Sequence, residues 1–456
     1  MVKTTLKTAF LAMMLAVTGT QITCSKANPP EMKASVEMEA LVAMDASIEM
    51  DAAAKMDAAL KRNASAGMDA ETELERILPI PFRIHLEPMD RLLLINFEDD
   101  PDSLYKGFEP QVFDDTVNGR GQLVIGWRVD GRVDVYHDHA LSPDPVAYDI
   151  AGKGLANMVE RDLSGSRFLV DEFGVQAHYG FEDIHGRWIE FSVSERNTRE
   201  RRPFGLLAPM GDAVENPPAM PLILLHEFYF VRQKDSDVSI RIGGREHATD
   251  MLPMPIDRSR MTFVRYCTDP LIAMLNPAMD GAMKILRLDG HISVQGELPA
   301  SESMAVSGDT EYMLQYVDGV PVLGGLQRRS CKHVLKLTFD PPFPNLVHMK
   351  ADEKAEGSFT IAGDPSTGSI HGHYGVSTAD ELIEVVMVPS GGWSPVPDRL
   401  SLRVLYRVAR VFRKWPETYR WTASIIRDNS GQEYYTGQED YAQQWHMQSE
   451  WERIDR

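Results

Sequence analysis

Short apolar segments separated by turn signals, arriving about every ten residues, dominate the chain from Pro79 onward and limit the folds open to it. The segment GQLVIGWRVDGRVDVYHDH, residues 121–139, contains an Asp-Gly turn between two apolar runs, the strongest short-range signal for a β-hairpin. The segment GFEDIHGRWIEFSVSE, residues 180–195, predicts a second hairpin that turns at His185 and Gly186. Few helical periods lie between such segments. We therefore predict an all-β fold, mostly antiparallel, built as a sandwich or barrel.

The tripeptide His-Tyr-Gly begins at His178 and occurs again at His373. Each copy continues with a polar stretch, the pair Ile-Glu and an apolar run that alternates as a half-buried strand does. We interpret this as a duplication that produces two tandem β-domains, residues 77–250 and residues 251–456. The alternative is a coincidence between two strands of common composition.

The stretch GFEDIHGRWIEFSVSERNTRERRPFGLLAPMG, residues 180–211, resembles the first-barrel hairpins of the hydroxyneurosporene synthase (carotenoid hydratase) group. Proteins of that group are built from two tandem lipocalin-like β-barrels, and the resemblance could cover residues 80–456. It implies a hydrophobic ligand cavity inside or between the barrels. It implies no particular chemistry, because no position matches a catalytic motif of the group clearly.

Residues 1–27 have the pattern of a signal peptide. Lys3 and Lys7 precede an apolar run that is far too short to span a membrane, and small residues favour cleavage after Ala27. We expect an exported protein, periplasmic or secreted. A lipid anchor at Cys24 is the alternative, but the residues before this cysteine do not match a lipobox.

Residues 28–76 form a low-complexity spacer with a six-residue repeat, most copies of which begin with methionine. Six residues turn an α-helix by about 600°, so the methionines would spiral around a helix instead of forming a stripe. The tract cannot bury a face, and we predict a solvated spacer that is partly helical or disordered.

A net charge of −20 and a pI of about 5.1 argue against binding to nucleic acid, whose phosphates would be repelled. No segment after the signal is apolar and long enough to span a membrane, and we do not expect membrane contact. The familiar hydrolase, zinc-protease and nucleotide-binding motifs are absent from the sequence, and we predict no cofactor.

Once the signal is removed, Cys267 and Cys331 are the remaining cysteines. An exported chain meets an oxidising compartment, in which the two could form a disulfide. Two buried free thiols are the alternative, because free cysteine packs as a small hydrophobic side chain.

His137 and His139 are two residues apart on an expected strand, so both side chains would point the same way and could chelate a metal. Their surroundings match only half of a cupin metal motif, and an exposed strand end is the competing interpretation. His371 and His373 have the same spacing and the same two interpretations.

Two histidine–glutamate pairs are the candidate catalytic residues, His178 with Glu190 and His373 with Glu384. In each pair the histidine precedes a hairpin turn and the glutamate follows it, so the two could lie on neighbouring strands about 5 Å apart at Cβ. A buried carboxylate would then orient the imidazole as a general base. The competing interpretation is a purely structural pair.

The segment of residues 399–414 fits two secondary structures. As a helix it would place its basic side chains on one face; as a strand it would alternate apolar side chains inward. A basic amphipathic helix can lie on an anionic membrane, although such a face is more often simply solvated. By analogy with the apolar segment LILLHEFYFV, residues 222–231, we favour the strand.

These sequence features suggest two functions from different classes. The first is an exported double β-barrel that binds a lipophilic small molecule. The second is a hydratase, isomerase or cyclase that uses histidine and glutamate as acid and base on the same scaffold. A third possibility is a structural or interaction protein displayed on its spacer.

Removal of residues 1–74 should leave the melting temperature of the folded part unchanged, because the spacer has no face to bury. The measurement is a thermal melt of a chain that starts at Glu75 beside the chain that starts after Ala27. A clear drop in melting temperature would show that the spacer packs on the folded part.

Overall fold

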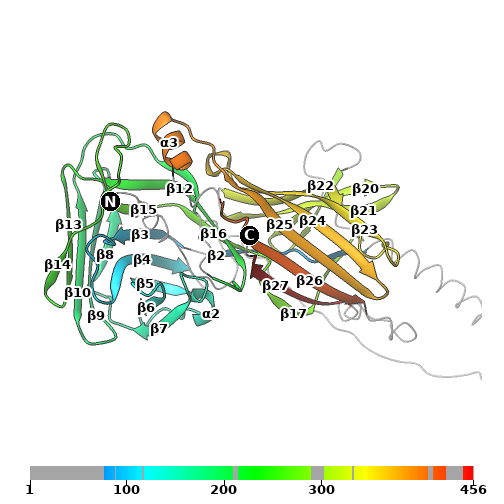
Figure 1. Cartoon of the computed structure of the whole chain (residues 1–456), viewed down its shortest axis with the longest axis horizontal. Helices are drawn as coiled ribbons and strands as arrows, with labels where there is room; N and C mark the ends of the chain where they lie inside the picture. The colour runs from blue at the N-terminus through cyan, green and yellow to red at the C-terminus, as the bar shows by residue number, and fades with distance from the viewer. Residues whose placement is uncertain are drawn as a thin grey trace, which may run out of the picture.

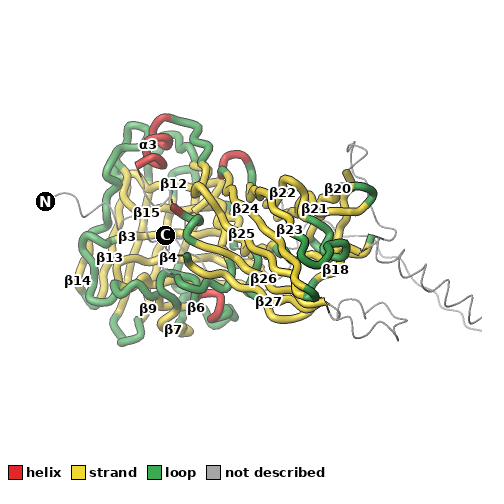
Figure 2. Tube along the Cα trace, turned by 45° about the vertical axis from the view of Figure 1, so that its right-hand side comes forward, coloured by secondary structure: helices red, strands yellow, loops and turns green. Residues whose placement is uncertain are grey.

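The computed structural model describes residues 77–454, apart from residues 88, 116–117, 209–213, 289–301, 331–332, 409–413 and 428–444. The predicted signal peptide and the predicted spacer therefore lie outside the described residues. The described chain is almost entirely β, with only short helical segments (Figures 1 and 2), which confirms the all-β prediction. Within the described residues no helix is long and apolar enough to cross a membrane.

The first folded unit is a sandwich of two sheets, drawn on the left of Figure 1. Its larger sheet has the order β2-β16-β12-β15-β3-β4-β5-β6-β7, with β11 paired to β12, and its smaller sheet has the order β14-β13-β10-β9-β8. The pairs are antiparallel except β6 with β7. The strands of the larger sheet are β2 (Ile84–Glu87), β3 (Arg91–Asn96), β4 (Tyr105–Asp115), β5 (Gly119–Arg128), β6 (Val133–His137), β7 (Leu155–Glu160), β11 (Phe204–Ala208), β12 (Met220–Arg232), β15 (Met261–Cys267) and β16 (Pro270–Leu275). Those of the smaller sheet are β8 (Arg167–Val170), β9 (Val175–Glu182), β10 (Trp188–Glu195), β13 (Ser236–Ile242) and β14 (Arg245–His247).

The second unit is a half-barrel formed by one curved antiparallel sheet with the order β17-β27-β26-β25-β24-β23-β22-β21-β20-β19. Its strands are β17 (Met279–Ala282), β19 (Glu302–Ser307), β20 (Thr310–Val317), β21 (Val320–Ser330), β22 (His333–Phe343), β23 (Lys354–Ala362), β24 (Ser369–Ala379), β25 (Leu382–Ser394), β26 (Tyr419–Arg427) and β27 (Trp445–Arg453). Three short helices complete the described structure: α2 (Pro145–Tyr148), the 3-10 turn η1 (Pro365–Thr367) and α3 (Leu400–Val408).

The larger sheet of the sandwich is buried on both faces. One face, with Leu93 and Ile95 of β3, packs against the smaller sheet. The opposite face, with Leu92 and Leu94, belongs to a second apolar core that continues into the concave side of the half-barrel. Because the sheet is covered on both faces, the side chains of β3 and β15 are buried at nearly every position and do not alternate between buried and exposed.

Residues 77–87 connect the two units at the start of the described chain. Strand β1 (Ile77–Ile80) pairs with β18 (Lys284–Arg287), and β2 pairs with β16 at the edge of the larger sheet. Between them the ring of Phe82 packs against Phe339, Phe343 and Trp421 of the half-barrel, with centroid distances of 4.8, 4.7 and 5.7 Å. This segment is thus part of both units.

The predicted boundary between residues 250 and 251 is crossed by hydrogen-bonded strands. Strands β15 and β16, which follow it in sequence, pair with β12 and β3 of the sandwich. The larger sheet therefore extends to Leu275. Whether the two units fold independently as domains stays a prediction.

Both predicted hairpins are present, and their turns use glycine as expected. Strands β5 and β6 are joined through Gly131, which has φ of 91°, and β9 and β10 through Gly186, which has φ of 73°. Both His-Tyr-Gly copies lie on the first strand of a hairpin, β9 and β24, with the histidine exposed and the tyrosine buried. The hairpins belong to sheets of different size and order, and the duplication stays a prediction.

Residues 400–408 form helix α3, so the preference for a strand was wrong. A strand would have placed Leu400, Val404 and Val408 on its buried face, yet these side chains are 73%, 39% and 49% exposed. The buried side chains are instead Leu402, Leu405 and Tyr406, at helical spacing. The basic face includes exposed Arg403 and Arg407. The helix packs on the sandwich, where the Tyr406 hydroxyl donates to the carbonyl of Gly205 at 3.0 Å (Figure 1).

Two glycines lie where the two units approach closely. A Cβ on Gly205 of β11 would lie 2.1 Å from the carbonyl oxygen of Ser366 in η1, and a Cβ on Gly363 would lie 2.2 Å from Leu224 Cδ2. Real Cβ contacts are not this short, so η1 can sit against β11 only because Gly205 has no side chain; the contact at Gly363 is with the end of the flexible Leu224 side chain, which could shift.

Gly205→Ala should destabilise the protein by about 1–3 kcal/mol, because the methyl group must push the backbone of η1 away from β11. The measurement is urea unfolding, with Gly375→Ala on β24 as the control, since a Cβ at Gly375 meets nothing within 4 Å. Equal unfolding free energies for the two variants would contradict the close docking.

Candidate functional site

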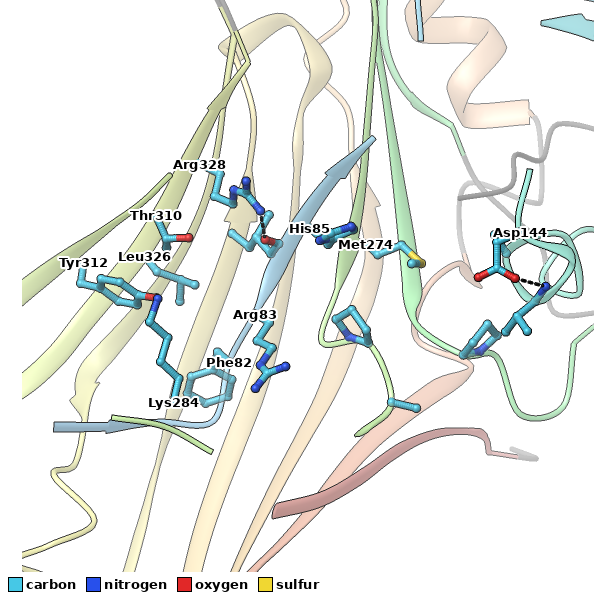
Figure 3. A pocket seen from close by; sticks show the side chains of 16 residues that line it. Phe82, Arg83, His85, Asp144, Met274, Lys284, Thr310, Tyr312, Leu326 and Arg328 are labelled. Atoms are coloured by element: carbon cyan, nitrogen blue, oxygen red, sulfur yellow. Dashed lines mark hydrogen bonds between the residues drawn. The ribbon is translucent and has the colours of Figure 1, made fainter. Parts of the chain in front are cut away.

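A pocket of about 690 Å³ lies where the sandwich meets the half-barrel (Figure 3). Its wall draws on both units, from the segment before and along β2, from β16, β18, β20 and β21, and from the start of α2. Its volume is in the range of small-molecule sites. The lining residues are Phe82, Arg83, Ile84, His85, Asp144, Val146, Ala147, Pro218, Met274, Pro277, Ala278, Lys284, Thr310, Tyr312, Leu326 and Arg328.

Four basic side chains line the pocket, labelled in Figure 3: Arg83, His85, Lys284 and Arg328. Arg83, the residue before β2, and His85 of β2 both line the pocket. Asp144, the N-cap of α2, is the one acidic residue among the described lining residues, and its carboxylate accepts from the backbone N–H of Val146 at 2.9 Å. The pocket is therefore positively charged within a chain whose net charge is −20.

The basic side chains differ in how firmly the protein holds them. Arg328 donates to the carbonyl of Ile84 at 3.0 Å and pairs with Asp309, so it is fixed in place. The ammonium of Lys284 lies 5.2 Å from the ring centre of Tyr312 and 3.4 Å from the carbonyl of Ser307. Among the described residues no carboxylate forms an ion pair with Arg83 or Lys284, so both cations can interact with a ligand.

The surroundings of the pocket lower the pKa of two of its basic groups, Arg83 and His85. Burial lowers the pKa of Arg83, although a guanidinium remains charged at any physiological pH. Burial, and next the charge of Arg328, lowers the pKa of His85 below its ordinary value, against a smaller opposing effect of Asp309. His85 also lies 3.4 Å from Glu87, measured from Nε2 to Oε1. An anion in the pocket would reverse this effect and favour the protonated imidazole.

The remaining lining is apolar. Phe82, Ile84 and Leu326 are buried side chains whose surfaces belong to the core shared by the two units. Met274 on β16 and the short helix α2 contribute further apolar surface. Basic groups beside apolar surface suit a ligand that has an anionic group and a hydrophobic part.

The predicted histidine–glutamate pairs do not face each other across their hairpins. His178 is opposite Ser192 and Glu190 is opposite Gly180, two residues further along. Glu190 lies 3.9 Å from Arg241 of the next strand. His373 is opposite Val388, whereas Glu384 is opposite Ser377, four residues away. Both histidines are exposed, and their catalytic role stays a prediction with no geometry that supports it.

The other predicted sites are not assembled either. His137 ends β6 and donates from Nδ1 to the carbonyl of Asp138 at 2.9 Å, while His139 is exposed in the following turn. His371 contacts Thr360 and Ser369 at 3.0 and 2.9 Å. The group of metal-binding side chains found among the described residues contains none of these histidines.

Cys267 is a buried free cysteine, and burial raises the pKa of its thiol. Its predicted partner, Cys331, lies outside the described residues, so the disulfide stays a prediction.

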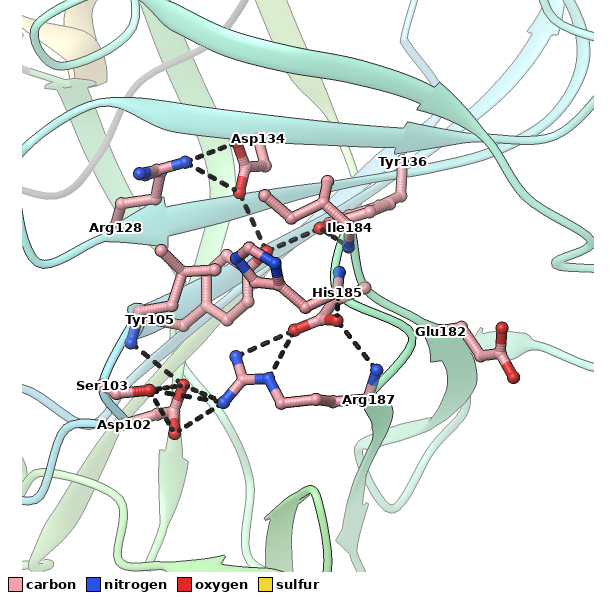
Figure 4. Close-up of polar contacts among 12 residues, drawn as sticks. Asp102, Ser103, Tyr105, Arg128, Asp134, Tyr136, Glu182, Ile184, His185 and Arg187 are labelled. Atoms are coloured by element: carbon pink, nitrogen blue, oxygen red, sulfur yellow. Dashed lines mark hydrogen bonds and ion pairs between the residues drawn. The ribbon is translucent and has the colours of Figure 1, made fainter.

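A buried polar network inside the sandwich has a structural role (Figure 4). The Tyr105 hydroxyl donates to Asp134 at 2.9 Å and lies 2.5 Å from the hydroxyl of Tyr136, which accepts from the backbone N–H of Ile184 at 3.2 Å. Burial raises the pKa of Tyr136 to about 12 and that of Tyr105 further, so both phenols stay protonated. The network ties β4 and β6 to the turn between β9 and β10.

Comparisons of the chain with protein-family models, with curated proteins and with solved structures found no match. The resemblance to the hydroxyneurosporene synthase group therefore rests on the sequence pattern alone.

The basic pocket could not be found from local patterns in the sequence. Arg83 and His85 are about 200 residues from Lys284 and about 245 residues from Arg328, and the segments that carry them have ordinary composition. The only local signal is a basic residue at alternate positions of Arg83-Ile84-His85 in an acidic chain. That signal could have marked the segment but not its partners.

Proposed function

We propose that this chain is a binding protein for an amphipathic small molecule that carries an anionic group. The observation that carries the proposal is the convergence of Arg83, His85, Lys284 and Arg328 on one pocket with apolar walls. The anionic group would interact with the basic side chains, and the hydrophobic part would lie against accessible lining residues such as Val146 and Met274.

The charge pattern supports this ligand class over a neutral lipid. Arg83 is exposed and Lys284 is half-buried, and neither has a carboxylate partner among the described residues, so a ligand that covers them without pairing with them costs free energy. A ligand anion would pair with them, and a charge-assisted hydrogen bond to such a group is stronger than a neutral one. A neutral hydrocarbon would leave both charges unpaired and less hydrated.

The proposal refines the lipophilic ligand expected from the sequence. It includes export of the chain, which is supported by the basic residues and the apolar run within residues 1–27. It also includes a lipocalin-like mode of binding, supported by the curved antiparallel sheet whose apolar interior adjoins the pocket.

Arg83→Gln should weaken binding of dodecanoate roughly tenfold, because a hydrogen bond to a charged group contributes about 1.5 kcal/mol or more. Binding is measured by calorimetry below the micellar concentration, with dodecanol as the neutral ligand of equal chain length. Arg403→Gln, which removes an exposed arginine of α3, is the matched control. Equal affinity for dodecanoate and dodecanol, or equal losses in the two variants, would refute the proposal.

The affinity for an anionic ligand should rise as the pH falls from about 8 to about 6, through the ordinary titration range of histidine. The pKa of His85 is lowered in the empty pocket, and a bound anion raises it, so binding takes up a proton and is favoured by acid. Dodecanesulfonate, which keeps its charge over this range, is the probe. His85→Gln should flatten the dependence; an unchanged slope in that variant would exclude His85 as its source.

A further inference from the structure

A cluster of two histidines and two aspartates lies where η1 and the start of β22 meet the sandwich. His226 is on β12 and Asp269 lies between β15 and β16, so both come from the sandwich. His333 is the first residue of β22, and Asp364 precedes η1, so both come from the half-barrel. The close approach at Gly205 and Gly363 brings the loop that carries Asp364 onto β12.

The ligand atoms of three of these residues are close together. Those of His226, His333 and Asp364 all lie within 4.8 Å of one another. His226 Nδ1 lies 3.6 Å from Asp364 Oδ2, and His333 Nδ1 contacts the same oxygen. The two imidazole rings are parallel, with a centroid distance of 3.6 Å. The side chains of His226 and His333 are only 7% and 11% exposed, whereas those of Asp364 and Asp269 are 30% and 22% exposed and leave the cluster open to solvent on that side.

The carboxylate of Asp269 contacts His333 from outside the group of three possible ligand residues. Its Oδ2 lies 2.7 Å from His333 Nε2, the ring nitrogen that faces away from Asp364. An N–H at Nε2 that donates to Asp269 leaves Nδ1 as the lone-pair nitrogen, directed at Asp364. A carboxylate that orients a histidine in this way is the usual outer-shell partner of a metal-binding imidazole.

We propose that His226, His333 and Asp364 form a binding site for a divalent transition-metal ion, with Asp269 as the positioning residue of His333. Two imidazoles and one carboxylate are a donor set of Zn²⁺ and Fe²⁺, whereas Ca²⁺ and Mg²⁺ prefer oxygen ligands throughout. The site is separate from the basic pocket and does not depend on the function proposed for it.

Binding of the metal ion would displace one proton and would require one imidazole ring to turn. The ion takes the place of the proton between His333 Nδ1 and Asp364, and that proton leaves to solvent as the metal–nitrogen and metal–oxygen bonds form. Bonds of about 2.0–2.2 Å place tetrahedral donors roughly 3.3–3.6 Å apart. The 3.6 Å between His226 Nδ1 and Asp364 Oδ2 already fits this spacing, whereas His333 Nδ1 and Asp364 must move apart to admit the ion. An imidazole lone pair lies in the ring plane, and one of the two parallel rings must therefore turn out of the stack to share the ion.

The site would link the two units through one ion. His226 comes from the sandwich, and His333 and Asp364 come from the half-barrel. An ion that binds only the assembled arrangement stabilises it by mass action. Metal binding should therefore raise the melting temperature.

The test is titration of the full chain, freed of metal by a chelator, with Zn²⁺ followed by calorimetry and with Co²⁺ followed by its visible absorption. We expect one ion per chain and a rise in melting temperature with Zn²⁺. His226→Gln and Asp364→Asn should weaken Zn²⁺ binding at least tenfold, and Asp269→Asn by about 10–100-fold, the usual effect of an outer-shell partner.

His137→Gln and His139→Gln are the controls, because they remove the histidines whose spacing suggests a metal site without forming one in the structure. Their Zn²⁺ affinity should be that of the unmodified chain. Circular dichroism and a metal-free melt of each variant separate loss of folding from loss of the site. The proposal fails if no stoichiometric Zn²⁺ binding occurs, or if folded His226→Gln and Asp364→Asn bind as tightly as the controls.

Discussion

The short segment of residues 77–87 is the constraint on which the relation between the two units depends. It pairs with β18 through β1 and with β16 through β2, and between the two strands it buries Phe82 in the half-barrel. Because the segment is held at both ends in this way, the two units cannot separate without breaking these strand pairs and the aromatic contacts of Phe82. The shared apolar core is a consequence, and so is the pocket, whose Arg83 and His85 lie on this same segment.

The parts of the fold that were predictable from sequence are those set by local geometry. The turn at Gly131 requires a positive φ that glycine adopts without strain, and the alternation on β10 specifies which face is buried. Helix α3 shows where local pattern was insufficient. Its apolar residues fit a period of two as well as 3.6, and the contacts of Leu402, Leu405 and Tyr406 with the rest of the protein decided for the helix. No local property of those nine residues contains that information.

The candidate sites were harder to predict because their residues meet only after long-range packing. His226 and His333 are separated by 107 residues (333 − 226), and neither has a second ligand at a spacing that a motif would show. His137 and His139 have such a spacing, yet the chain turns away after β6. Spacing within one strand shows only which way side chains point. A buried site needs other segments to supply partners, and the fold brings them to His226 and not to His137.

The two sites at the contact between the units differ in what they require of the protein. In the basic pocket, Arg328 is held by Ile84 and Asp309 while Arg83 has no carboxylate partner among the described residues, so the charge is already in place before a ligand arrives. In the histidine cluster the carboxylates of Asp269 and Asp364 already contact His333, so an ion must displace a proton and turn a ring. Each site takes residues from both units, and anything that binds there favours the joined arrangement over a separated one. The backbone contact at Gly205 and the core around Phe82 hold that arrangement without either ligand. Occupancy would therefore add stability to a contact that already exists, and neither ligand is needed to create it.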